Sequence, residues 1–259
     1  MPNIAIVWDF DGTLSPDDST TKVVELLDSR KGNEFWAYVK KLRGDQKRPK
    51  WEHVLASDAP IWMYALSRIA FERGVPLNAE FFGKFVKPHI ALYDDVPSLF
   101  RRVRLLEELS SFKSVGLRIH HFIITAGLKD LVEQILPDGL VRWTLGCRYE
   151  VVAFNGNVKE PESVPVFCME ETMKTRSLFE ISKGSFEDKN RSVNTRVSED
   201  DRWAPFRNFI YIGDGETDIP ALSLVRSQGG IGIAVFNPAK PKRMSKKGFA
   251  QCDWTNEPI

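Results

Sequence analysis

The stretch IAIVWDFDGT at residues 4–13 decides the fold of this chain. It begins with an unbroken apolar run of the kind that lies buried in the middle of a parallel sheet. The run stops abruptly at Asp9, and Asp11 follows two residues later. In an open parallel sheet, ligands bind at the carboxyl ends of the strands. The stretch therefore predicts a buried strand that delivers two carboxylates to a candidate site.

Strands and helices are expected to alternate from about residue 97 onward. Apolar runs predict strands over 117–124, 208–212 and 231–236, and a hairpin from 148–154 and 164–167. The intervening patterns predict helices over about 97–116, 128–135, 174–182 and 219–225. The first of these helices is expected to bury one apolar face and to end at Gly116; the face comprises Leu99, Phe100, Val103, Leu106 and Leu109. This alternation predicts a Rossmann-like α/β fold with a three-layer core, in which helices cover both faces of a parallel sheet.

The segment 15–96 carries apolar residues at helical spacing and no clear strand pattern. Helix starts are expected at Asp17, Asp18 or Ser19, and then at Asn33, Pro60 and Asn78. We therefore predict an all-helical domain over 15–96, inserted into a core domain made of 1–14 and 97–259.

The composition is that of a globular protein. The 259 residues are 42% hydrophobic and 27% charged, with a net charge of +1. This balance argues against a general nucleic-acid binder, and the basic residues of 240–247 are interpreted as a solvated helix face. No apolar run reaches the length of a membrane span, so no membrane partner is expected. The three cysteines and the absence of a secretion-signal pattern predict a cytoplasmic protein.

Polar residues follow three of the predicted strands where each strand ends. Asp9 and Asp11 follow the first, Thr125 the second, and Asp214 and Asp218 the third. At 4 Å and an effective dielectric constant of 20, each pair of carboxylates repels by about 4 kcal/mol, which a cation would offset. Oxygen ligands without nearby His or Cys favour a hard ion such as Mg²⁺. A calcium loop of the EF-hand type is excluded, because its required Gly and Glu are missing from both acidic segments.

The TAG segment 125–127 is expected to turn from a strand into a helix. Free backbone N–H groups at a helix start attract an anion such as phosphate, and the small side chains leave room for it. An aspartate beside such a site can attack phosphorus, while a second carboxylate moves the proton. Alternate residues of an extended segment share a face, so Asp9 and Asp11 can serve one substrate.

Four motifs in order resemble those of the haloacid dehalogenase superfamily of phosphohydrolases. They are DFDGT at 9–13, IITAG at 123–127, Lys174, and GDGETD at 213–218. The resemblance implies that Asp9 is the nucleophile and a Mg²⁺ ligand. It implies that Asp11 is the general acid and base, with its backbone carbonyl on the metal.

The resemblance extends to the remaining site residues. It implies that Thr125, with the amides of Ala126 and Gly127, binds the phosphate, and that Lys174 neutralises the phosphate and Asp9. Asp214 is implied as a direct metal ligand and Asp218 as a residue that positions the metal or its waters. Lys174 is the weakest of these assignments, because Arg176 and Lys183 lie nearby.

The helical insert is similar to the type-one cap of the phosphoserine phosphatase-like branch, which closes over the site. This implies a Mg²⁺-dependent phosphatase that hydrolyses a small phosphorylated metabolite through an aspartyl-phosphate at Asp9. The alternatives are a phosphotransferase or mutase with the same intermediate, and a module that binds Mg²⁺ and phosphate without turnover. A dehalogenase is disfavoured, because it would not need Asp11 or the acidic fourth motif. The sequence leaves the oligomeric state open.

Several other features have a structural interpretation. His120 and His121 are expected in the core or on the sheet, and the insert aromatics Trp36, Trp51 and Trp62 in the core, with room for one at a pocket. The charged segment 184–202 is expected to form a surface element or a loop.

Overall fold

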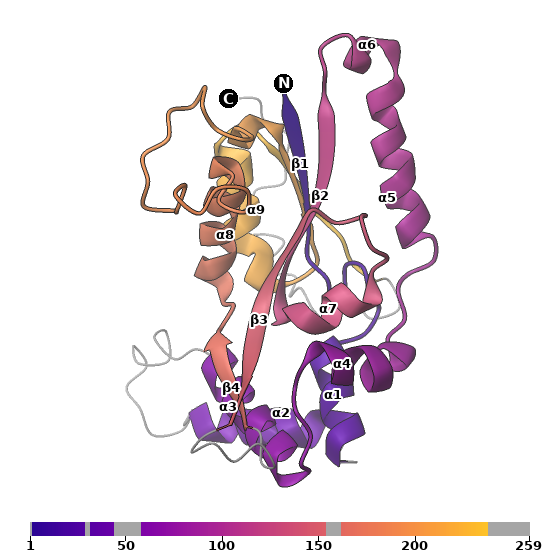
Figure 1. Cartoon of the computed structure of the whole chain (residues 1–259), viewed down its shortest axis with the longest axis vertical. Helices are drawn as coiled ribbons and strands as arrows, with labels where there is room; N and C mark the ends of the chain where they lie inside the picture. Colours follow the sequence, from indigo (N-terminus) through magenta and orange to yellow (C-terminus); the bar gives the residue numbers. More distant parts are fainter. Residues whose placement is uncertain (1, 29–31, 44–57, 154–161, 238–259) are drawn as a thin grey trace.

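Figure 1 shows the computed structural model, which describes residues 2–28, 32–43, 58–153 and 162–237. A six-stranded sheet runs in the order β4-β3-β2-β1-β5-β6. Neighbouring strands are parallel except for the antiparallel pair β3–β4. The strands are β1 (Asn3–Trp8), β2 (Arg118–Leu128), β3 (Trp143–Val152), β4 (Glu162–Phe167), β5 (Phe209–Gly213) and β6 (Ile231–Ala234). The predicted α/β fold and its hairpin are confirmed.

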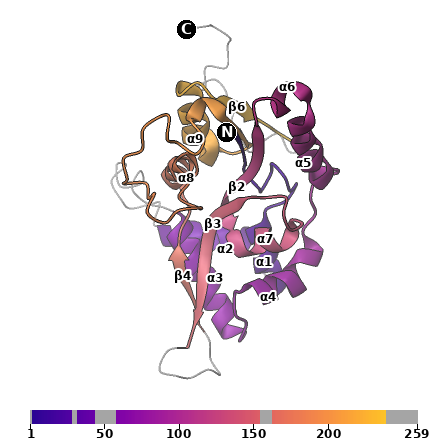
Figure 2. The same ribbon diagram turned by 45° about the horizontal axis from the view of Figure 1, so that its top comes forward.

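Helices cover both faces of the sheet. The helices of the insert are α1 (Ser19–Asp28), α2 (Gly32–Arg43), α3 (Asp58–Glu72) and α4 (Ala79–Phe81). Those of the core are α5 (Val96–Arg104), α6 (Ser110–Lys113), α7 (Lys129–Ile135), α8 (Glu171–Lys183) and α9 (Ile219–Ser227). Figures 1 and 2 show α8 and α9 on one face and α5 and α7 on the other. This is the expected three-layer core.

β1 lies inside the sheet because its residues are apolar on both sides. Ala5 and Val7 are fully buried, and Ile6 joins a second apolar cluster beneath α5. The strand pairs with β2 on one side and with β5 on the other, so that Ala5 faces both His120 and Phe209. The next backbone N–H, that of Asp9, donates to Ile212 O at 2.8 Å. The ladder therefore carries Asp9 directly to the carboxyl edge.

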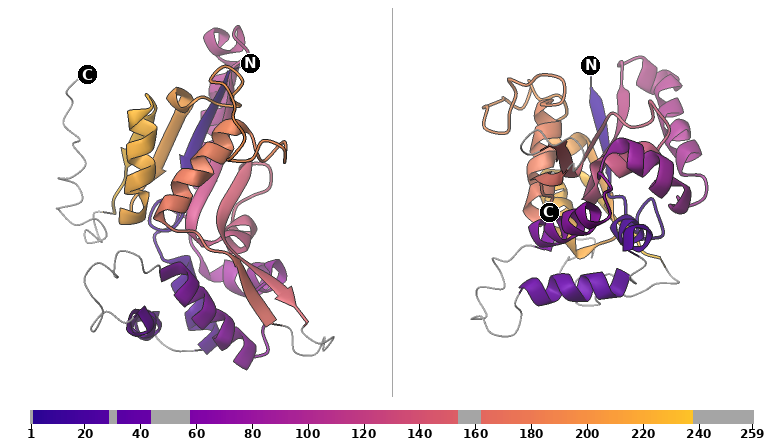
Figure 3. Two further views of the ribbon diagram at one scale, coloured as in Figure 1. Left: turned by 90° about the vertical axis from the view of Figure 1, so that its left-hand side faces the viewer. Right: turned by 60° about the horizontal axis from the view of Figure 1, so that its bottom comes forward.

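The helices α1, α2 and α3 gather at the end of the sheet where β1 stops (Figure 3). The chain enters this insert next to the point where it leaves, because Tyr93 N–H donates to Leu14 O at 2.9 Å. Asn78 accepts from Phe81 N–H at 2.9 Å, as its predicted role at a helix start requires. The division into domains over 1–14, 15–96 and 97–259 stays a prediction.

The β3–β4 hairpin extends from the sheet onto the insert. Tyr149 O–H donates to Met63 O at 2.6 Å, and Leu77 N–H donates to Ser163 Oγ at 2.8 Å. All four residues are buried, so losing either bond would leave a buried polar group without a hydrogen-bond partner. The hairpin therefore braces the insert against the core.

The predicted helix over 97–116 is wrong in its second half. α5 ends at Arg104, a 3₁₀ turn follows, and Leu109 adopts an extended conformation with ψ of 134° before the short α6. Phe100 is fully buried, whereas Leu106 and Leu109 are 42% and 50% exposed. The residues 99–109 do have helical spacing, but the apolar core against which the helix packs extends only as far as Val103. Gly116, with φ of 66°, does end the segment.

His121 links three core elements, as its predicted core position implies. Trp8 Nε1–H donates to its Nδ1 at 3.1 Å, and its Nε2 lies 3.2 Å from Phe100 O. Because the indole can only donate, the Nδ1 atom carries no proton and the neutral ring donates from Nε2. Burial lowers the pKa of His121 to about 4.

The segment 184–202 forms a surface loop without helix or strand. The ammonium group of Lys183 donates to Val193 O and Thr195 O, which anchors it. Phe186 and Trp203 pack against Phe122 of β2. The loop is therefore a fixed extra surface element. Trp51 and the basic residues of 240–247 lie outside the described residues.

Among the residues that the structure describes, no helix is long and apolar enough to cross a membrane.

Candidate active site

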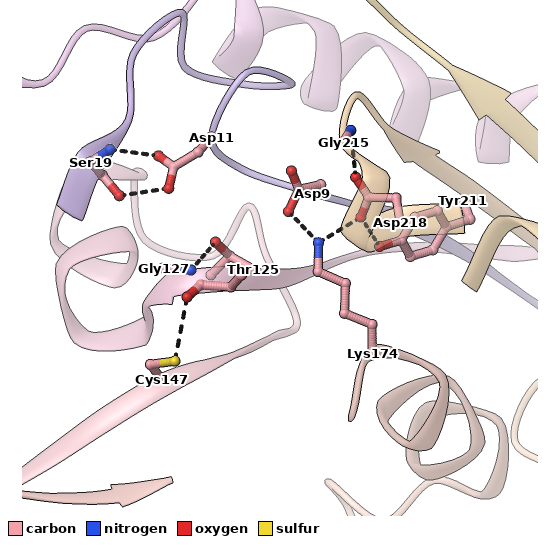
Figure 4. Close-up of polar contacts among 11 residues, drawn as sticks. Asp9, Asp11, Ser19, Thr125, Gly127, Cys147, Lys174, Tyr211, Gly215 and Asp218 are labelled. Carbon is pink, nitrogen blue, oxygen red and sulfur yellow. Dashed lines mark hydrogen bonds and ion pairs between the residues drawn. The ribbon is translucent and has the colours of Figure 1, made fainter. Parts of the chain in front are cut away.

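Three buried carboxylates converge at the carboxyl edge of the sheet. Asp9 follows β1, Asp214 follows β5, and Asp218 ends a 3₁₀ turn at Glu216–Asp218. One oxygen from each lies within 4.8 Å of the others. Figure 4 shows that Asp9 and Asp218 both reach the ammonium group of Lys174. The structure thus brings together residues separated by more than two hundred positions.

Two glycines make this convergence possible. Gly12 has φ of +86°, and a Cβ atom there would lie 2.0 Å from Asp214 Oδ2. At Gly213, a Cβ atom would lie 2.5 Å from Asp218 Cγ. Any larger residue would collide with a carboxylate of the cluster. The glycines in the DFDGT and GDGETD motifs are therefore required by the packing of the site itself.

Lys174 is the fully buried cation of the site. Its Nζ lies 2.9 Å from Asp9 Oδ1 and 2.6 Å from Asp218 Oδ1. Burial lowers the pKa of Lys174, but Asp218 and Asp9 outweigh it and leave this pKa above its ordinary value. The alternatives lie elsewhere: Arg176 pairs with Glu180, and Lys183 binds loop carbonyls.

The cluster holds more negative than positive charge. Burial and the charge of Asp218 raise the pKa of Asp9 to about 7, although Lys174 opposes this. One ammonium group cannot balance three carboxylates, so a cation would stabilise their ionised forms. The donors of the cluster are all oxygens, which suit a hard divalent ion such as Mg²⁺. Asp9, Asp214 and Asp218 therefore fit a metal site.

Asp11 stands apart from this cluster. Its Oδ1 accepts from Ser19 N–H at 2.9 Å and its Oδ2 from Ser19 Oγ–H at 3.0 Å (Figure 4). The carboxylate thus points to the first residue of α1, and the structure does not place it among the clustered acids. Burial and then Asp18 raise the pKa of Asp11 well above its ordinary value. This arrangement suits a group that exchanges a proton.

The segment 125–127 differs from the expected strand-to-helix turn. β2 continues to Leu128, which pairs with Cys147 after a register irregularity, and α7 begins only at Lys129. Gly127 N–H donates to Thr125 Oγ1 at 2.9 Å, and the Cys147 thiol donates to Ala126 O at 3.4 Å. The pairing with β3 extends the strand beyond its apolar run. Thr125 and Gly127 nevertheless line the site.

A cavity of about 330 Å³ joins these groups to the insert. Its core lining comprises Asp9, Asp11, Thr125, Ala126, Gly127, Asp214, Gly215, Glu216 and Thr217, and its insert lining comprises Asp18, Thr20, Trp36, Asp58 and Trp62. Trp36 is held in place because its Nε1–H donates to Thr21 Oγ1 at 2.8 Å. Trp36 and Trp62 thus both line the pocket, whereas the insert aromatics were expected in the core with room for one of them at a pocket.

Sequence reasoning missed Ser19 and Tyr211 as residues of the site. Ser19 was expected only as one of three candidate helix starts, but as the first residue of α1 it donates two hydrogen bonds to Asp11. Tyr211 O–H donates to Asp218 Oδ1 at 2.7 Å from within β5. A polar tip in the middle of an apolar strand, two residues before the GDGETD motif, was the available signal.

No family model matches the sequence. An uncharacterized protein of Borreliella burgdorferi is 23% identical over 238 residues, which cover 86% of this chain and 79% of that protein. A HAD family hydrolase of Salmonella enterica serovar Typhi matches with a TM-score of 0.48 and 14% identity, covering 91% of this chain and 69% of that chain.

A probable phosphoserine phosphatase from Vibrio cholerae matches with a TM-score of 0.50 and 13% identity, covering 97% of this chain and 64% of that chain. The chain therefore has the same fold as this probable phosphoserine phosphatase. This α/β fold is the one that the resemblance to the haloacid dehalogenase phosphohydrolases predicted.

Proposed function

We propose that this protein is a Mg²⁺-dependent phosphatase that hydrolyses a small phosphorylated metabolite through an aspartyl-phosphate at Asp9. The observation that carries the proposal is the position of Lys174, buried between Asp9 and Asp218 at 2.9 and 2.6 Å. Burying an ammonium group among carboxylates is costly, because all of the charges lose their hydration, and such costly arrangements cluster at functional sites. Here the ammonium group contacts one oxygen of Asp9, the proposed nucleophile.

The first chemical step would form the covalent intermediate. An oxygen of Asp9 attacks phosphorus, and the bond between phosphorus and the leaving oxygen breaks. Asp11, protonated beforehand, gives its proton to that leaving oxygen as it departs as an alcohol. The raised pKa of Asp11 favours the protonated form that this step needs.

The second step would return the enzyme to its starting state. Asp11, now ionised, takes a proton from water, whose oxygen attacks phosphorus and displaces Asp9. Inorganic phosphate leaves and Asp11 is again protonated. Thr125 and the amides of Ala126 and Gly127 would hold the phosphoryl oxygens through both steps, with the Gly127 N–H leaving Thr125 Oγ1 to do so. Lys174 would offset the negative charge that gathers around phosphorus in each transition state.

Mg²⁺ held by Asp9, Asp214 and Asp218, with the backbone carbonyl of Asp11, would supply positive charge that draws the phosphoryl group to the site. The insert would bound the organic part of the substrate and keep bulk water out. A cavity of about 330 Å³ limits that part to a small molecule. We therefore propose a small metabolite as the partner, in preference to nucleic acid or a membrane component.

The test is release of phosphate from p-nitrophenyl phosphate with Mg²⁺, with and without EDTA. We expect Asp9→Asn to abolish turnover and Asp138→Asn, at an exposed position, to leave it unchanged. Trapping of ³²P on the wild-type chain but not on Asp9→Asn would identify the covalent step. Turnover that survives in Asp9→Asn or in EDTA would overturn the proposal. A transferred phosphoryl product in place of free phosphate would instead favour a phosphotransferase.

A further inference from the structure

Tyr211 is a tyrosine of β5 whose ring lies in the core and whose hydroxyl reaches the acidic cluster. The side chain is fully buried, and its O–H donates to Asp218 Oδ1 at 2.7 Å (Figure 4). The ring alone would satisfy the packing, and a phenylalanine has the same ring. The hydroxyl therefore contributes through its hydrogen bond.

The hydrogen bonds to Asp218 explain what that contribution is. An ionised carboxylate has about four acceptor positions, two on each oxygen. Oδ1 receives Lys174 Nζ at 2.6 Å and Tyr211 O–H at 2.7 Å, and Oδ2 receives Gly215 N–H at 3.0 Å. Oδ1 is therefore filled, and the remaining acceptor position belongs to Oδ2.

We propose that Tyr211 is a positioning residue of the metal site: with Lys174 it occupies Oδ1 of Asp218, so that Asp218 faces the cation through Oδ2 alone. This inference rests on the Mg²⁺ site of the proposed function. Hydrogen bonds of this kind fix the orientation of a ligating carboxylate, and their loss typically weakens metal binding by about 10- to 100-fold.

An uncharged donor suits this position better than a second cation. Lys174 is shared between Asp9 and Asp218, and its charge must also serve the phosphoryl group. Tyr211 holds Asp218 without adding a charge to the site. Lys174 can therefore bond to Asp9 as well, because the orientation of Asp218 does not depend on Lys174 alone.

The chain contains a matched control for this argument. Tyr149 is also buried, and its O–H donates to Met63 O at 2.6 Å, between the hairpin and the insert. Its acceptor is a backbone carbonyl away from the acidic cluster. Tyr149→Phe and Tyr211→Phe therefore each remove one buried hydroxyl that donates one hydrogen bond. They differ in whether that bond reaches the site.

The experiment measures Mn²⁺ binding to the full chain without substrate, from the electron paramagnetic resonance signal of the free ion. We expect Tyr211→Phe to raise the Mn²⁺ dissociation constant at least about tenfold, and Tyr149→Phe to leave it within twofold of wild type. The Mg²⁺ concentration for half-maximal turnover should rise in parallel for Tyr211→Phe, with a smaller change in kcat at saturating Mg²⁺. Circular dichroism establishes that both variants retain the native fold.

The outcomes separate this inference from the proposed function. If the wild-type protein is a Mg²⁺-dependent phosphatase and Tyr211→Phe binds Mn²⁺ as tightly as Tyr149→Phe, the role of Tyr211 is overturned and the function stands. If the wild-type protein binds no Mn²⁺ and EDTA leaves its turnover unchanged, the metal site and the role of Tyr211 fall together.

Discussion

Gly12 illustrates how a single backbone position controls this site. It combines a positive φ with a carboxylate oxygen 2.0 Å from where a Cβ atom would lie. Gly74 also has a positive φ, of 63°, but has nothing within 4 Å of the same position. Comparing alanine substitutions at Gly12 and Gly74 therefore distinguishes the free-energy cost of the backbone conformation from that of the collision with Asp214.

We expect Gly74→Ala to lower the free energy of unfolding by about 1–2 kcal/mol, the cost of a left-handed conformation. Gly12→Ala should cost more, because Asp214 must also move, and it should abolish Mg²⁺-dependent turnover. Urea denaturation of the two variants, with a phosphatase assay, provides the measurement. Equal losses of stability with full activity in Gly12→Ala would contradict the account of this contact.

Lys174 offers a second prediction at the scale of one residue. Lys174→Met removes the buried partner of two carboxylates, and a broken buried ion pair typically costs about 3–5 kcal/mol. We expect a loss of that size in urea denaturation. Lys113→Met is the control, since Lys113 pairs with Glu108 on the exposed surface, where an ion pair contributes little to stability. A loss in Lys174→Met no larger than in the control would show that the buried pairs contribute little.

At the scale of the element, β2 joins the core to the site and carries His121 on the way. The neutral ring of His121 takes up its second proton with a pKa of about 4 in the folded chain, against an ordinary value of 6.5. The unfolded chain therefore holds more protons between these two pH values. Stability should fall as pH drops from 6.5 toward 4, by at most roughly 3 kcal/mol from this group.

The check is the pH dependence of unfolding for wild type and for His121→Gln, which cannot take up a proton in this range. Carboxylates titrate alike in both proteins, so the difference between the two profiles isolates His121. We expect the variant to be less stable at pH 7 and to lose less stability on acidification. Profiles that run parallel from pH 7 to pH 4 would refute the lowered pKa.

The same elements show what the sequence could and could not predict. The apolar run before Asp9 was enough to predict β1, because a strand buried on both faces has few other interpretations. The order of the acidic motifs led to Asp9, Asp214 and Asp218 at one edge. The end of β2 was predicted too early, since residues 125–128 join the sheet only by pairing with β3. The break at Leu109 was missed because helical spacing does not reveal where the core ends.

At the scale of the whole molecule, the cavity between core and insert links ligand binding to stability. Mg²⁺ with beryllium fluoride mimics a phosphoryl group on an aspartate. It should bind the folded chain and not the unfolded chain. At a hundred times its dissociation constant, such a ligand stabilises by about 2.7 kcal/mol. We expect Tm to rise accordingly in wild type and not in Asp9→Asn. Hydrogen exchange should slow in α1 as well as at the strand ends, and protection confined to the core would show that the insert does not close on the ligand.

The central place of β1 also has a consequence for synthesis on the ribosome. One neighbour of Ala5 in the sheet is His120 and the other is Phe209. At roughly 5–20 residues per second, the second neighbour emerges roughly 10 to 40 s after the first strand. The apolar strand β1 must wait that long to pair with its second neighbour. A nascent chain stalled before residue 209 would therefore present β1 with one edge open, and this is the form on which a ribosome-bound chaperone would act.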